Sequence, residues 1–139
     1  MKSPLNIKLD KIAHMPTRAH VSDAGLDLYA PYPATIPSHG YTVIDTGVHI
    51  NIPEGYVGLI TSRSSLMLKG LTTRGTIDAG YHGPIRVVLF NHSDVPYIVH
   101  TDDRIAQLVI LPIITPHVSI VGAFPDSDRN EDGFGSSGR

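Results

Sequence analysis

Residues 42–60, TVIDTGVHINIPEGYVGLI, decide the fold class of this chain. Apolar and β-branched residues are spread over both sides of the segment Asn51–Gly55, which contains a proline and a glycine. Alternation with a period of two is typical of β-strands, and clusters of Asn, Pro and Gly are typical of turns. The stretch therefore predicts strands joined by a turn.

The rest of the chain repeats this pattern. Thirteen glycines and eleven prolines are scattered over 139 residues and divide them into short β-prone pieces. Short strands at regular spacing predict an all-β protein, a sandwich or a barrel. A single short helix is expected at Ser65–Lys69, with a serine as N-cap and Gly70 at its end. The predicted strands are Leu5–Leu9, Thr42–Ile50, Tyr56–Ile60, Ile85–Asn91, Tyr97–Val99, Ile105–Ile114 and Val118–Val121.

Composition excludes several classes of protein. Lys and Arg number 11 and Asp and Glu 13, so the net charge is −2, whereas a general nucleic-acid binder is basic. The absence of cysteine excludes disulfides, thiolate zinc sites and a thiol nucleophile. None of the histidines has the helical spacing of a zinc protease. Without an apolar run of roughly 18 residues or a signal-peptide core, we expect a soluble protein of a reducing cytoplasm, with no membrane partner.

The length is that of one domain, and a composition shift near Pro125 divides it. Residues 125–139, PDSDRNEDGFGSSGR, are polar and glycine-rich. We expect a β domain over residues 1–124 and a flexible tail over 125–139. Phe134 does not fit a purely disordered end. Together with Arg129 and the glycines it suggests a segment that becomes ordered on a ligand.

The segment 75–83, GTIDAGYHG, allows two interpretations. Its Asp and Gly residues are turn formers, so it predicts a simple β-hairpin. As a functional hairpin, its backbone groups would pair with a flat ligand such as a base. Tyr81 would then stack on a sugar, and Asp78 would hold a water as general base.

Three further places in the sequence also allow two interpretations each. Ser62-Arg63-Ser64-Ser65 caps the short helix or forms a phosphate pocket from free N–H groups, hydroxyls and one arginine. Gln107 interrupts an apolar run, either facing solvent on an edge strand or reaching a polar ligand. Asp27 alternates with Leu26 and Leu28, so it lies on a solvated strand face or in a site.

Five segments occur in a fixed order: AGLDLYA (24–30), SRSSL (62–66), GTIDAGYHG (75–83), RIAQLVILPI (104–113) and RNEDGFGSSGR (129–139). Together they closely resemble the five motifs of the homotrimeric dUTPase family. The resemblance implies a jelly-roll-like β-barrel that assembles as a homotrimer. It also implies hydrolysis of dUTP to dUMP and pyrophosphate with Mg²⁺, which limits uracil in DNA and supplies dUMP for dTMP synthesis.

The resemblance also implies roles for individual residues. Asp78 matches the carboxylate that activates water for attack on the α-phosphorus, and Tyr81 matches the ring that packs on deoxyribose. Asp27 matches a carboxylate that contacts the metal through water. The uracil would pair with the backbone of Gly75, Thr76, Ile77 and Arg86. The phosphate contacts would be Arg63, Ser64, Ser65 and Gln107, and the tail would add Arg129, Phe134, Gly135, Ser136 and Ser137.

By the same resemblance, each active site would combine three chains. One contributes the segments around Asp27, Arg63 and Gln107, a second contributes the turn with Asp78 and Tyr81, and a third contributes its tail as a lid.

Some positions depart from the family pattern. Ser65 stands where glycine is common, and Thr72 where many bacterial members carry asparagine. Asn130 and Asp132 replace tail glycines, and the added negative charge of Asp132 predicts weaker closure over phosphates. Asp103 and Arg104 are expected to form a structural pair.

Two alternative functions remain. A dCTP deaminase of the same fold uses a glutamate in the hairpin region, and Asp78 in its I-D-x-x-Y-x-G setting argues against that reaction. The second alternative is a jelly-roll module that binds a regulatory protein. This alternative applies particularly if the protein comes from a phage.

Overall fold

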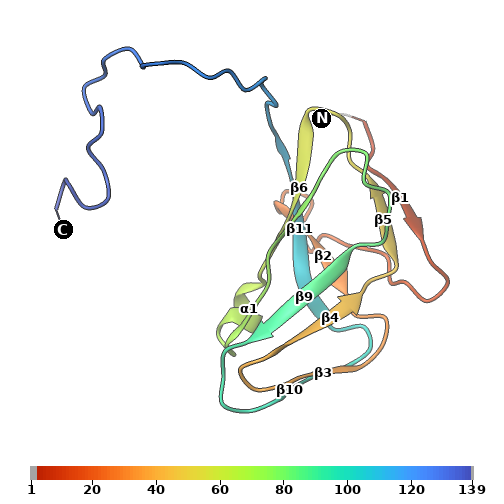
Figure 1. The fold of residues 1–139 in the computed structure, drawn as a ribbon. Helices are drawn as coiled ribbons and strands as arrows, with labels where there is room; N and C mark the ends of the chain where they lie inside the picture. The colour runs from red at the N-terminus through yellow and green to blue at the C-terminus, as the bar shows by residue number, and fades with distance from the viewer. Residues whose placement is uncertain (1–2, 139) are drawn as a thin grey trace.

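The computed structural model describes residues 3–138, and almost all of its regular structure is β (Figure 1). A single turn of helix, α1, interrupts the strands. The elements are β1 (Asn6–Leu9), β2 (Gly25–Tyr29), β3 (Ala34–Ile36), β4 (Tyr41–Asp45), β5 (Val48–Asn51), β6 (Tyr56–Thr61), α1 (Ser64–Met67), β7 (Leu71–Thr72), β8 (Gly75–Ile77), β9 (Arg86–Asn91), β10 (Tyr97–Val99) and β11 (Arg104–Pro112).

The strands form antiparallel sheets whose neighbours are mostly distant in sequence. The largest sheet has the order β2-β11-β6-β8, and a second has the order β4-β9-β7. Two further pairs, β1-β5 and β3-β10, complete the walls. Such long crossovers between antiparallel strands are typical of jelly rolls. The predicted all-β, jelly-roll-like fold with one short helix is confirmed.

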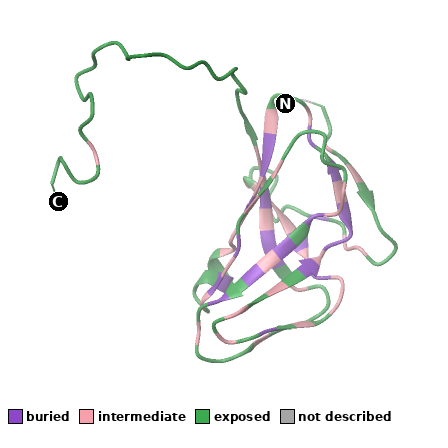
Figure 2. Ribbon diagram, in the orientation of Figure 1, coloured by how far each residue is buried: buried purple, intermediate pink, exposed green. Residues whose placement is uncertain are grey.

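Alternation along the strands builds the core. In β9 the side chains of Val87, Leu89 and Asn91 are buried, while their neighbours are more exposed. Leu28 of β2 and Leu108 of β11 are fully buried against them. Burying one such side chain stabilises the fold by about 1.5–3 kcal/mol, so this shared interior holds the sheets together. Figure 2 shows the buried residues concentrated inside the strand body.

Three predicted elements differ from the structure. The stretch Thr42–Ile50 forms two strands, because the chain bends at Thr46 and Gly47, where Gly47 has a φ of 68°. Val118–Val121 is not a strand and is exposed, since β-prone residues form strands only beside a partner. The helix begins at Ser64, and its N-cap is Arg63 without a side-chain hydrogen bond, so the predicted serine cap is wrong.

The predicted hairpin at residues 75–83 is also wrong. β8 pairs with β6, whereas β9 pairs with β4 and β7 in a different sheet. Pro84 lacks an N–H, and the N–H of Ile85 donates to the carbonyl oxygen of Val48, 2.8 Å away. The segment is therefore a turn that carries the chain from one sheet to another.

After β11 the chain leaves the body. The last backbone contact with the body joins the N–H of Ile113 to the carbonyl oxygen of Gly55, at 2.9 Å, among the described residues. The following segment extends away from the strands as a long arm (Figure 1). Among residues 3–138, no helix is long and apolar enough to cross a membrane.

Candidate active site

A polar cleft of about 430 Å³ lies where β2 and β11 meet the start of α1. β11 lies between β2 and β6, and its register sets Gln107 opposite Asp27 on one side and Thr61 on the other. Three of the five motifs therefore converge on one place. The cleft is lined by Ala19, Asp23, Ala24, Gly25, Asp27, Ser62, Arg63, Ser64, Met67, Arg104 and Gln107.

Two arginines hold Asp27. Its Oδ1 lies 3.2 Å from Arg63 Nε and its Oδ2 lies 3.6 Å from Arg104 Nη1. The Asp27 side chain is only 14 % exposed, so the interpretation as a solvated strand face is wrong. One carboxylate between two guanidinium groups leaves an excess positive charge, which attracts anions.

Arg104 was expected to pair with Asp103, and this expectation is wrong. The carboxylate of Asp103 instead accepts a hydrogen bond from the backbone N–H of His100, at 2.8 Å. The register of β11 on β2 shifts between Arg104 and Ala106. In a regular strand, Arg104 and Gln107 would point to opposite faces, because they are three residues apart. The irregularity brings both side chains to the cleft.

Gln107 lies on a central strand, so its interpretation as a solvent-facing edge residue is wrong. Its Nε2 donates to the carbonyl oxygen of Ser62 at 3.3 Å. A Cβ atom at Gly25 would lie 2.5 Å from Gln107 Oε1, so only glycine leaves room for the amide in this position.

The serines before and in α1 divide between two cavities. Ser64 lines the cleft, whereas Ser65 lines a neighbouring cavity of about 400 Å³ that shares Arg63 and Arg104. Ser65 Oγ accepts a hydrogen bond from Arg63 Nη1 at 3.3 Å. Ser65 thus orients the guanidinium group that also faces Asp27.

The turn after β8 presents Asp78 and Tyr81 at the surface. The N–H of Tyr81 donates to the carbonyl oxygen of Asp78 at 3.2 Å, and Gly80 between them has a φ of 85°. The Tyr81 hydroxyl donates to the carbonyl oxygen of Pro84 at 2.9 Å, and its ring lies against Gly83. The Tyr81 ring is thereby fixed while one side stays open.

This turn does not reach the cleft of its own chain. β6 runs from Gly58 toward α1, and β8 runs the opposite way, with Ile77 beside Gly58. Asp78 follows at the far end, about five residues of strand from Ser62, or roughly 16 Å at ~3.3 Å per residue. In Figure 1, α1 and the green loop after β8 lie at opposite ends of the body. One chain therefore holds two separate halves of the predicted site.

The backbone around this turn has a free side. β8, which comprises Gly75, Thr76 and Ile77, is the outer strand of its sheet, so one edge of its backbone is open to a ligand. Arg86 begins β9 in the other sheet, and its Nε lies 3.9 Å from Asp45 Oδ2. Thr72, at the departure from the family pattern, bonds through its hydroxyl to His92 Nε2 at 2.8 Å.

The tail residues are not brought to the cleft. Arg129 Nε donates to the carbonyl oxygen of Asp132 at 2.5 Å. The N–H of Ser136 donates to the carbonyl oxygen of Gly133 at 3.0 Å. Phe134 is fully exposed. Gly135 and Ser137 lie beside it in the same exposed stretch. Within the described residues, the hydrogen bonds of the tail join it only to itself.

Sequence reasoning missed the lining residues Ala19, Asp23 and Met67, and it assigned Arg104 to a structural pair and not to the site. Asp23 directly precedes the first motif, which is a signal that could have been used. Its Oδ2 accepts from the N–H of His20 at 2.9 Å. In residues 3–138 no group of three or more His, Asp or Glu side chains is arranged to hold a metal ion.

Solved structures with this fold define a class of nucleotide-binding jelly-roll enzymes. The dUTPase of Staphylococcus bacteriophage 80alpha, with dUPNHPP bound, aligns over 99 % of this chain and 100 % of its own. The two share 37 % identity with a TM-score of 0.93. A mutant dUTPase from phage phi11 of S. aureus, described with a structural Mg(II) ion, aligns over 88 % of this chain and 99 % of its own, at 34 % identity and a TM-score of 0.82.

The family follows from the sequence comparisons. Residues 11–138 match the dUTPase family model. A deoxyuridine 5'-triphosphate nucleotidohydrolase from Gloeobacter violaceus is 40 % identical, over 97 % of this chain and 98 % of its own. A deoxyuridine 5'-triphosphate nucleotidohydrolase from Yarrowia lipolytica is 43 % identical, over 94 % of this chain and 85 % of its own. The chain belongs to the dUTPase family of enzymes.

Proposed function

We propose that this chain hydrolyses dUTP to dUMP and pyrophosphate. The observation that carries the proposal is the cleft in which Arg63 and Arg104 surround Asp27, on a fold that holds dUPNHPP in the phage 80alpha enzyme. A triphosphate is the kind of anion that two guanidinium groups bind well. Arg63, Ser64, Ser65 and Gln107 are the phosphate contacts in this proposal.

In the chemical step, Asp78 takes a proton from a water molecule. The water oxygen attacks the α-phosphorus, and the bond to the leaving pyrophosphate breaks on the opposite side. This displacement depends mainly on positioning and on neutralising charge. Asp78 is exposed in the free chain, which leaves it accessible to an incoming nucleotide.

The turn around Asp78 also provides selectivity. Uracil pairs with the open edge of Gly75, Thr76 and Ile77 and with the backbone at Arg86, which rejects bases with a different donor and acceptor pattern. Tyr81 packs on the deoxyribose and leaves no room for a 2′-hydroxyl. The Tyr81 contacts with Pro84 and Gly83 support this, because they hold the ring in one orientation.

The active protein is a homotrimer with shared sites. Asp78 and Arg63 of one chain lie too far apart to act on one nucleotide, so the cleft of one copy faces the turn of another. The arm after β11 supports assembly, because its apolar side chains are largely exposed and another copy would cover them. These side chains are Ile114, Val118, Ile120 and Phe124.

The division into a β domain over 1–124 and a closing tail over 125–139 belongs to the same proposal. The tail brings Phe134 over the uracil. Arg129, Gly135, Ser136 and Ser137 contact the γ-phosphate.

Magnesium fits this cleft only together with the substrate. Both oxygens of Asp27 face arginines, so no free cluster of carboxylates competes for a bare cation. A hydrated Mg²⁺ carried by the triphosphate would meet Asp27 through its water molecules. Bound there, it would neutralise charge on the phosphates.

The proposed cellular role is to limit uracil in DNA and to supply dUMP for dTMP synthesis, in the cytoplasm. A regulatory role is a separate prediction. Phage 80alpha dUTPase is described as controlling the transfer of virulence genes. A protein partner of that kind stays a prediction for this chain.

A nucleotide panel tests the proposed function. The purified protein is incubated with dUTP, UTP, dTTP and dCTP, with and without Mg²⁺, and pyrophosphate and ammonia are measured. We expect pyrophosphate from dUTP alone, and none from the Asp78→Asn variant. Ammonia released from dCTP would instead indicate a deaminase. No product from any nucleotide would favour the protein-binding module.

A further inference from the structure

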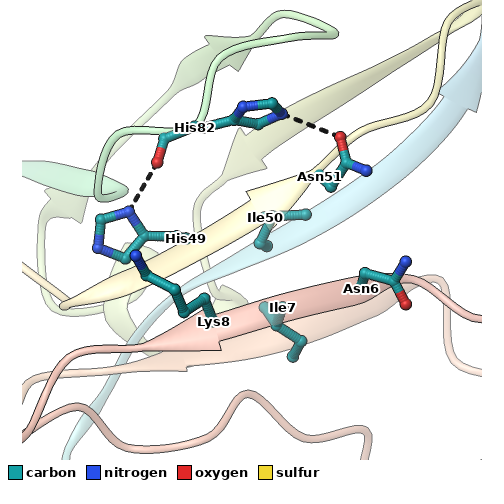
Figure 3. Close-up of a pocket in the computed structure, with 7 residues that line it drawn as sticks. All are labelled: Asn6, Ile7, Lys8, His49, Ile50, Asn51 and His82. Carbon is teal, nitrogen blue, oxygen red and sulfur yellow. Dashed lines mark hydrogen bonds between the residues drawn. The ribbon is translucent and has the colours of Figure 1, made fainter.

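We propose that His49, which lies outside all five motifs, positions the turn that carries Asp78 and Tyr81. The proposal rests on the proposed function, since it concerns the same turn. Figure 3 shows His49 on β5 directed at the backbone of His82, the residue after Tyr81. His49 is therefore a positioning residue, which acts through the turn and not on the nucleotide.

Two hydrogen bonds fix the His49 ring. Its Nδ1 lies 2.7 Å from the carbonyl oxygen of His82, and its Nε2 lies 3.0 Å from Asp10 Oδ1. The carbonyl oxygen and the carboxylate are both acceptors, so the ring is the donor in these contacts, and a hydrogen bond from it to the Asp10 carboxylate is charge-assisted. The ring is 17 % exposed, and such charge-assisted hydrogen bonds are stronger than neutral ones.

The turn has few other supports. Asn51, two residues along β5 and on the same face, accepts from His82 Nε2 at 3.0 Å (Figure 3). Among residues 3–138, no other side chain from outside the turn forms a hydrogen bond with residues 78–84. The other bonds of this segment join Tyr81 to Asp78 and to Pro84 within the turn itself. The side chains of β5 therefore supply the hydrogen bonds that fix the turn from outside it.

The N-terminal segment completes this arrangement. β1 pairs with β5 so that Lys8 lies opposite His49, and the N–H of Asp10 donates to the carbonyl oxygen of Gly47 at 2.8 Å. The anchored Asp10 carboxylate orients the imidazole toward His82. A segment of the chain that contains none of the family motifs thus helps to place Asp78.

Steady-state kinetics of His49→Gln test the proposal. Glutamine donates through one nitrogen only, so we expect kcat/KM for dUTP to fall by roughly tenfold, the cost of losing one charge-assisted hydrogen bond. Both kcat and KM should change, because Asp78 and Tyr81 lie on the same turn.

Matched controls separate positioning from general effects. Asp10→Asn keeps the ring but removes its charged partner, and should reduce kcat/KM by about threefold, since the hydrogen bond becomes a neutral one. Asp94→Asn alters a similar pair, in which His39 Nε2 lies 2.7 Å from Asp94 Oδ1 at the exposed surface. That variant should keep the kinetics of the unmodified protein.

Amide hydrogen exchange gives a reading without substrate. In His49→Gln the amides of residues 78–85 should exchange faster, while those of β11 should not change. If the unmodified protein releases no pyrophosphate from dUTP, the proposed function fails, and exchange still tests the positioning role. Unchanged kinetics and unchanged exchange in His49→Gln would overturn the inference. Should that variant fail to fold, Asp10→Asn, whose side chain is 50 % exposed, decides by the same two measurements.

Discussion

At the scale of single residues, the cleft depends on an imbalance of charge around one carboxylate. Asp27 faces both Arg63 and Arg104, so the guanidinium groups stay ordered while no ligand is bound. Holding two cations in place before an anion arrives reduces the entropy that binding must overcome. Asp27 thus holds the two guanidinium groups in place and offsets part of their positive charge.

Replacing Asp27 by asparagine should separate these two effects. Without the carboxylate, metal-free pyrophosphate should bind more tightly, because the positive charge is no longer offset. Turnover of dUTP should fall, and the free energy of unfolding should decrease by about 1–3 kcal/mol through the loss of two partly buried ion pairs. Isothermal titration calorimetry and urea denaturation measure these changes, with Asp94→Asn as control. Weaker binding of pyrophosphate would contradict this account of Asp27.

Gly83 offers a second test at this scale. A Cβ atom there would lie 2.4 Å from the Tyr81 hydroxyl oxygen, so Gly83→Ala must displace the ring. We expect KM for dUTP to rise up to about tenfold through lost ring packing, with little change in melting temperature. Gly122→Ala, where no atom lies within 4 Å of the added Cβ, is the matched control. A KM equal to that of the control would argue that Tyr81 does not contact the nucleotide.

At the scale of elements, buried polar contacts between strands and loops decide local geometry. Asn91 at the end of β9 is 1 % exposed. Its Nδ2 donates to the carbonyl oxygens of Ile36 and Val95, and its Oδ1 accepts from the N–H and hydroxyl of Ser93. All four hydrogen-bonding positions of this amide are used, so it joins β9 to β3 and to the loop before β10.

The change Asn91→Asp removes both donors and buries a carboxylate. The carbonyl oxygen of Ile36 would lose this donor, and that of Val95 would keep only the Ser93 hydroxyl, so we expect the free energy of unfolding to fall by about 2–4 kcal/mol. Urea denaturation measures the change. Asn130→Asp, in the exposed tail, should shift stability by less than about 0.5 kcal/mol. Equal stability of the two variants would mean that the Asn91 contacts contribute little.

At the scale of the whole molecule, the chain divides its functional groups among distant places. The cleft lies near α1, the Asp78 turn lies at the other end of β6, and the tail extends beyond both (Figure 1). None of these parts is a complete site. In the proposed homotrimer, parts from different copies would form one site.

Removing residues 125–139 tests this division. The segment is exposed and polar, so its loss should leave folding and trimer formation unchanged. Turnover of dUTP should fall by roughly 100-fold, because the substrate is no longer held and covered. Size-exclusion chromatography with light scattering and steady-state kinetics provide the measurements. Full activity would exclude a closing role for the tail, and a monomeric product would contradict the prediction that the tail is not needed for assembly.

Much of the fold was predictable from sequence, because it depends on local pattern. Runs rich in apolar and β-branched residues predicted strands at Tyr56–Ile60 and Ile85–Asn91, and both segments form strands. The short strands β3 and β7 were not predicted, whereas β10, which also has only three residues, was. Val118–Val121 was wrongly predicted, since composition cannot reveal whether a partner strand exists.

The sequence by itself determined the fold class, the family and the residue types available for chemistry, because alternation, turn residues and ordered motifs are all local. Only the tertiary structure decided how these residues meet. Strand register placed Asp78 at the opposite end of β6 from Arg63, and a shift in β11 brought Arg104 to Asp27. Register and strand irregularities arise from pairing between distant segments, which no local pattern encodes.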